Sequence, residues 1–173
     1  MNDYESKEIM INLFGEENFE INSAPFLVKA LEEENSIRFI VALPVQSKTR
    51  TDINDTGIPV LNKILKESFS IYPDENNLYE ILFEDYVFHI TRNESYTYWD
   101  DYEIRNGKYF IIFDKSRLLD YLPQLVEPEI VTAYYPNRWK HYGIYCQNHI
   151  IDVIATKKPK IKNIRCIPKD LVF

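Results

Sequence analysis

WKHYGIYCQNHIIDVIA, residues 139–155, is the stretch that decides the fold class of this 173-residue chain. Two runs rich in Ile, Val and Tyr, 139–146 and 149–155, lie on either side of the polar pair Gln147–Asn148. β-branched and aromatic residues fit the pleated surface of a strand, and a polar pair between two such runs favours a turn. The stretch therefore predicts a β-hairpin, and hairpins build antiparallel sheets.

A second stretch, LYEILFEDYVFHITR at 78–92, has the same character. With its turn at Glu84–Asp85 it forms a hairpin in which Glu80 lies opposite His89. Neither turn residue is Gly or Asn, so the register of the hairpin is uncertain by one or two residues. A slip of one residue would move every side chain to the opposite face of the sheet. In this register five apolar residues share the other face: Tyr79, Ile81 and Phe83, with Phe88 and Ile90 across from them.

The segments before these hairpins are expected to add one or two strands and a helix. Ile37–Val45 reads as a strand, and 26–33 reads either as a helix or, preferably, as a strand paired with it through 34–36. Residues 46–57 read as a polar loop. A helix with one buried face is expected to follow from Pro59, capped by Asp55 or Thr56. Its apolar positions are Val60, Leu61, Ile64 and Leu65.

Between the two hairpins, Asn106–Gly107–Lys108 marks a turn, and 109–113 is apolar on both sides, as in a central strand. A short helix is expected next, capped by Asp114 or Ser116 and ended by Pro123. Its apolar face would be made by Leu118, Leu119 and Leu122. A last strand is expected at 161–167.

Together these elements predict an α+β fold: a mostly antiparallel sheet of six to eight strands built from hairpins, with two or three helices packed on it. The length fits one domain over 1–173, with 1–22 as an entry helix or a loose acidic N-terminal arm. There are two cysteines, no basic and apolar leader at the start, and no run of 18 apolar residues. We therefore expect a soluble cytoplasmic protein without a membrane segment.

Charge is distributed unevenly along the chain, whose net charge is −7. Residues 1–127 carry 12 Lys and Arg against 24 Asp and Glu, whereas 128–173 carry 8 against 3. An acidic body repels nucleic acid and attracts basic partners. The basic tail 128–173, which includes the basic segment 157–165, would either contact phosphate or, as we favour, dock on the acidic body.

No cofactor or metal is expected. The four glycines are too far apart for a phosphate-binding loop. Residues 52–57 resemble the start of a calcium-binding EF-hand loop, but Lys63 occupies the position of the essential bidentate Glu. Cys146 and His149 would face each other across the 139–155 hairpin, but no third zinc ligand is near them in sequence.

One stretch, NESYTYWDDYE at 93–103, is unlike a core strand. Read as a strand, it places acids and rings on both faces, and a buried acid needs a partner; at least one face should therefore be wet or covered by another molecule. Large rings with polar tips bind partners well, and carboxylates select basic ones. The candidate partner-binding residues are Glu94, Tyr96, Tyr98, Trp99, Asp100, Asp101, Tyr102 and Glu103, with Glu80 and His89 as accessory residues.

The leading hypothesis is a non-enzymatic binding or inhibitor protein that occludes a basic protein through this acidic, aromatic surface. Bacterial immunity proteins and phage-encoded inhibitors do such work, and the analogy is one of charge and size alone. One alternative is a small hydrolase that uses the paired carboxylates of Asp100 and Asp101, with His89. Another is nucleic-acid binding through the basic segment 157–165.

Overall fold

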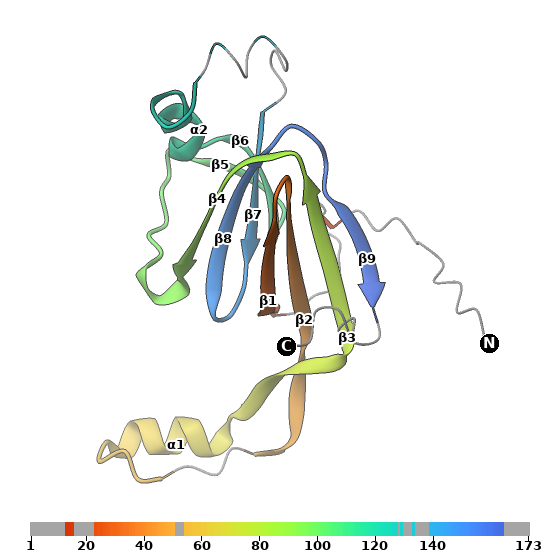
Figure 1. The fold of residues 1–173 in the computed structure, drawn as a ribbon. Helices are drawn as coiled ribbons and strands as arrows, with labels where there is room; N and C mark the ends of the chain where they lie inside the picture. The colour runs from red at the N-terminus through yellow and green to blue at the C-terminus, as the bar shows by residue number, and fades with distance from the viewer. Residues whose placement is uncertain are drawn as a thin grey trace, which may run out of the picture.

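The computed structural model describes residues 13–15, 23–50, 54–127, 129, 133 and 139–164. Within them the chain forms two antiparallel sheets, with two short α-helices and two short 3₁₀ turns (Figure 1). The mostly antiparallel architecture is as predicted, but nine strands divide between two sheets instead of forming one. The first sheet has the order β1 (Phe26–Glu33), β2 (Ser36–Arg50), β3 (Phe69–Glu84), β9 (Lys160–Ile164). The second has the order β4 (Tyr86–Asn93), β8 (His149–Ala155), β7 (Lys140–Tyr145), β6 (Phe110–Lys115), β5 (Ile104–Asn106).

The main core combines alternate residues of both sheets. Successive strand residues point to opposite faces, and one face of each sheet supplies apolar side chains such as Phe39 and Phe83 of the first and Ile151 of the second. Phe14 is also buried there, and its ring meets those of Phe83, Phe110 and Tyr142 edge to face, with centroids 5.2–6.0 Å apart. Part of the expected N-terminal arm is thus anchored in the core; 1–12 and 16–22 lie outside the described residues.

Two of the local predictions are confirmed. β7 and β8 pair as the hairpin predicted at 139–155, and the Cys146 amide donates to the His149 carbonyl oxygen at 2.8 Å across the turn. β1 and β2 also pair, with the turn at Glu34–Asn35, so 26–33 is a strand.

The prediction that 78–92 forms a hairpin is wrong. β3 belongs to the first sheet and β4 to the second, so the chain crosses between sheets at Asp85. Asp85 has a left-handed backbone conformation (φ 54°), and its amide donates to the Asn35 carbonyl oxygen at 2.8 Å. Phe88 and Ile90 therefore pair with residues of β8, and Glu80 does not face His89.

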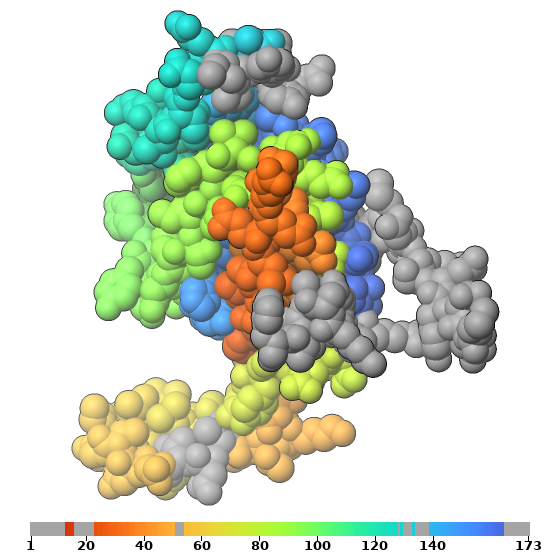
Figure 2. Space-filling view, in the orientation of Figure 1, coloured from red at the N-terminus to blue at the C-terminus, as the bar shows by residue number. Residues whose placement is uncertain are grey.

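An arm, made by residues 44–50 and 54–72, extends from the first sheet beyond the body of the molecule, where Figures 1 and 2 show it as a separate projection. The expected loop at 46–57 begins as strand, because β2 continues to Arg50 and pairs with the start of β3. Helix α1 (Pro59–Glu67) lies at the tip of the arm, begins after Ile58 and has no side-chain cap. No residue of α1 is buried, so the expectation that this helix packs one face on the sheet is wrong.

The second helix follows its sequence signals. α2 (Arg117–Tyr121) is capped by Ser116, whose side chain accepts from the Leu119 amide at 3.1 Å. The turn η2 (Leu122–Gln124) follows and contains Pro123. β9 begins one residue before the strand expected at 161–167 and includes 161–164 of it, and 165–167 lie outside the described residues. Among the described helices, none has the length and apolar character needed to cross a bilayer.

Candidate functional site

The stretch from Glu94 to Glu103, here called the aromatic loop, connects β4 to β5 and is not the strand that its alternation suggested. It contains the turn η1 (Glu94–Tyr96) and no further helix or strand. The Asn93 side chain accepts from the Ser95 amide, and the Asp100 side chain accepts from the Tyr102 amide, both at 2.9 Å. Such side-chain bonds to nearby amides compete with a strand ladder and explain why the strand ends at Asn93.

Three rings of the aromatic loop lie in solvent. The exposed fractions are 86% for Tyr96, 83% for Tyr98 and 64% for Trp99. Tyr102 differs, because its hydroxyl donates to Asp120 of α2 and its ring lies below the Lys115 ammonium group at 3.6 Å. Tyr102 therefore belongs to the support of the loop rather than to its exposed surface.

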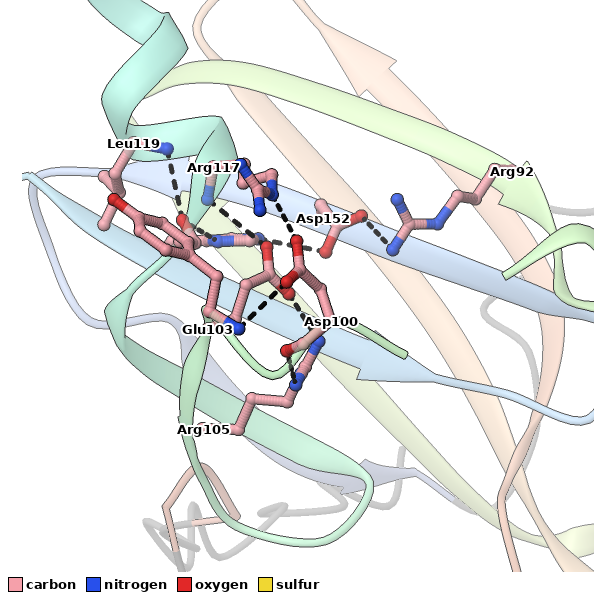
Figure 3. Close-up of polar contacts among 10 residues, drawn as sticks. Arg92, Asp100, Glu103, Arg105, Arg117, Leu119 and Asp152 are labelled. Carbon is pink, nitrogen blue, oxygen red and sulfur yellow. Dashed lines mark hydrogen bonds and ion pairs between the residues drawn. The ribbon is translucent and has the colours of Figure 1, made fainter. Parts of the chain in front are cut away.

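The four acids of the loop also divide into two pairs. Asp100 forms an ion pair with Arg117, and Glu103 forms one with Arg105 (Figure 3). Arg105 also donates to the backbone oxygen of Asp100 at 2.9 Å. Glu94 and Asp101 are exposed and form no ion pair with a described residue. Asp100 and Glu103 therefore fasten the loop to α2 and β5, whereas Glu94 and Asp101 face water.

Below the loop, a column of flat groups passes from the surface into the second sheet. The Arg105 guanidinium lies 4.2 Å from the centroid of the Trp99 ring and 5.6 Å from that of Phe113. Phe113 stacks in parallel on His141, with centroids 3.8 Å apart. Arg105, Phe113 and His141 are cross-strand neighbours on β5, β6 and β7, which is why they share one face.

The column ends on a buried polar chain. His141 Nδ1 is 2.8 Å from the Ser116 hydroxyl, and Nε2 is 2.9 Å from one carboxylate oxygen of Asp152. The other oxygen of Asp152 pairs with Arg92 at 3.2 Å (Figure 3). An ionised Asp152 only accepts, so Nε2–H of His141 donates to it, whereas the Ser116 hydroxyl, which accepts from the Leu119 amide, keeps a proton and a second lone pair with which to meet Nδ1. Every bond in the chain then has a donor and an acceptor.

Ser116, His141 and Asp152 are the residue types of a nucleophilic triad, but their burial favours a structural role. Their exposed fractions are 0%, 2% and 2%. A nucleophilic serine must reach its substrate, and this hydroxyl is enclosed and engaged as the cap of α2. The sequence did not reveal this polar chain, because Ser116, His141, Asp152 and Arg92 come from four separate parts of the fold. The local signal that did exist was the capping position of Ser116.

The two accessory residues lie apart from the loop. Glu80 is buried in the first sheet, where it pairs with Lys162 at 2.9 Å and Arg38 at 3.6 Å. His89 lies in the second sheet, 3.6 Å from Glu32 of β1. The preferred docking of the basic segment on the acidic body is confirmed at three lysines. They are Lys157 with Asp85, Lys160 with Glu84 and Lys162 with Glu80.

No protein-family model matches the sequence, and comparison with curated proteins and with solved structures finds no significant match.

The ion pair between Asp100 and Arg117 gives a testable pH dependence. The hydrogen bond from Arg117, followed by that from the Tyr102 amide, holds the pKa of Asp100 below its usual value of 3.8. A lowered folded-state pKa means that the pair stabilises the folded loop above the unfolded pKa, and that this contribution is lost as the pH falls through the folded pKa. In an Arg117→Gln variant we expect the pKa of Asp100 to rise towards 3.8, measured by carboxyl NMR titration. Lys108→Gln serves as the control, and an unchanged Asp100 pKa in Arg117→Gln would show that the guanidinium does not hold it.

Proposed function

We propose that the chain is a non-enzymatic binding protein that captures a basic protein through the aromatic loop. One observation carries the proposal: Tyr96, Tyr98 and Trp99 lie in solvent on a loop whose two ends are fixed. Three large exposed rings within four consecutive residues are unusual on a free surface, and Tyr and Trp are among the residues that contribute most to binding at interfaces.

The support below the rings favours binding without a large ordering cost. Asn93 fixes the start of the loop, and the Asp100–Arg117 and Glu103–Arg105 pairs fix its end. Binding by a mobile segment loses free energy to the ordering of that segment, whereas a surface that is already ordered avoids this loss. We infer that Asp100 and Glu103 position the rings, and that the partner contacts Glu94 and Asp101.

Charge supports a basic partner. The chain has a net charge of −7, and the two loop acids that face water add negative charge beside the rings. Complementary charge speeds association and excludes acidic competitors, and its effect decreases with salt. Where the rings enter the partner's own binding site, capture becomes inhibition by occlusion.

The alternative hydrolase receives less support from this geometry. Asp100 is bound to Arg117 and its pKa is lowered, so it is a poor proton donor near neutral pH. Asp101 is exposed to solvent. The two carboxylates therefore lie in different environments, whereas a shared proton requires them to face each other in one site.

Affinity capture from an extract of the native host tests the proposal. The immobilised protein should retain a protein with a net positive charge, identified by mass spectrometry and released by raised salt. A variant with Tyr96→Ser, Tyr98→Ser and Trp99→Ser, here called the ring variant, should not retain it. Equal retention by the ring variant, or retention that does not respond to salt, would contradict the proposal.

A further inference from the structure

The arm carries an unusual amount of exposed apolar surface. In helix α1, Val60 is 70% exposed and Ile64 is 59% exposed, although both lie on the apolar face of the helix. Half of the large apolar side chains that are exposed in the described residues belong to the arm. These are Val45, Ile58, Val60, Leu61, Ile64, Phe69, Ile71 and Tyr72.

Helix α1 also lacks the packing that a helix of its length needs. It has nine residues, whereas isolated helices shorter than about 12–15 residues are marginal in water. Helices in proteins gain most of their stability by packing an amphipathic face, and no residue of α1 is buried in the single chain. The helix is therefore suited to packing against a surface outside its own chain.

We propose that the occupant is a second copy of the chain, bound arm to arm in a two-fold dimer. Val45 and Tyr72 pair across the arm and share one face, whereas Phe69 and Ile71 point to the other face. One of these pairs together with Ile58, Val60, Leu61 and Ile64 makes six side chains, and their exposed fractions give roughly 550 Å² per molecule. A standard interface buries about 800 Å² per partner, of which little more than half is apolar. A two-fold axis brings the same patch of both copies together, so the arm needs no other complementary surface.

The charges along α1 fit this pairing. Lys63 and Glu67 are four residues apart and border one edge of the apolar face. In an antiparallel pair of α1 helices whose two-fold axis passes near Leu65, Lys63 of one copy lies towards Glu67 of the other, and the axis repeats the contact. The arm is also less acidic than the rest of the chain, because residues 44–72 contain four Lys and Arg and three Asp and Glu. Self-repulsion is therefore smallest where the two copies meet.

This inference is independent of the proposed function, because the arm and the aromatic loop share no residues. Sedimentation equilibrium at roughly 1–100 µM covers the weak end of the affinities that standard-size interfaces reach. The wild-type protein should approach twice the chain mass as concentration rises. A Val60→Ser, Ile64→Ser double variant should raise the dimer dissociation constant by about 100-fold, at about tenfold for each substituted position, which the dimer contains twice.

The ring variant is the matched control and should dimerise like the wild type. Amide hydrogen exchange gives a second readout that does not depend on the variant's folding: α1 amides of the wild type should gain protection with rising protein concentration. A wild-type protein that stays monomeric over the whole range overturns the proposal. So does a double variant that remains folded and dimerises as strongly as the wild type, because the interface would then lie elsewhere.

Discussion

An Asp152→Ala variant is expected to lose about 1–3 kcal/mol of unfolding free energy, the usual cost of leaving a buried polar group without its hydrogen-bond partner. Asp152 is 2% exposed, accepts from His141 and forms an ion pair with Arg92. Without its carboxylate, Nε2–H of His141 has no acceptor, and the Arg92 guanidinium loses its partner. For a chain of this length the loss corresponds to a decrease of roughly 2–12 °C in melting temperature, measured by calorimetry.

Two variants calibrate this first prediction. Asp152→Asn keeps an oxygen for His141 but removes the charge that pairs with Arg92, so its destabilisation should be intermediate. Asp101→Ala removes an exposed carboxylate that forms no ion pair with a described residue, and it should melt like the wild type. An Asp152→Ala protein with wild-type stability would show that the polar chain from Ser116 to Arg92 does not hold the second sheet and α2 together.

The second prediction concerns affinity. With the captured partner purified, the ring variant is expected to bind at least 100-fold more weakly than the wild type, because central aromatic anchors contribute about 2 kcal/mol or more each when truncated. The same substitutions should change stability little, since the three rings are largely exposed. Isothermal titration calorimetry and thermal melting of the same samples separate the two effects.

A matched control for the ring variant is Tyr72→Ser, which removes an exposed ring from the arm and leaves the loop intact. It should bind the partner like the wild type. A Glu94→Gln, Asp101→Asn variant should mainly slow association and reduce the salt dependence. Similar losses in Tyr72→Ser and in the ring variant would indicate general stickiness of exposed rings rather than a defined site.

Local signals in the sequence predicted most of the individual elements. The apolar runs around Gln147–Asn148 and around Glu34–Asn35 gave two hairpins, and Ser116 gave the cap of α2. Each of these signals lies within about 20 residues, where the pairing partner is close in sequence. The apolar spacing after Pro59 also located α1 correctly, but it gave no information on what its apolar face contacts.

Features that depend on distant residues were not predictable in the same way. At Asp85 the chain turns towards a different sheet, and the pattern of 78–92 is compatible with a hairpin until the partners of β3 and β4 are known. The polar chain from Ser116 to Arg92 requires the register of β4, β7 and β8 together. Which loop acids are paired and which are exposed depends on the positions of Arg105 and Arg117. The alternation of residues along one strand gives no information on those positions.

Fluorescence quenching of Trp99 tests the central claim most directly, namely that the rings of the aromatic loop are free in the isolated protein and covered by the partner. Trp99 and Trp139 are the two tryptophans of the chain, so a Trp139→Phe variant isolates the emission of Trp99. We expect acrylamide to quench Trp99 nearly as well as free tryptophan, and the purified partner to shield it. A Trp99 that is already shielded in the isolated protein, or that stays fully quenchable when the partner is bound, would contradict the account.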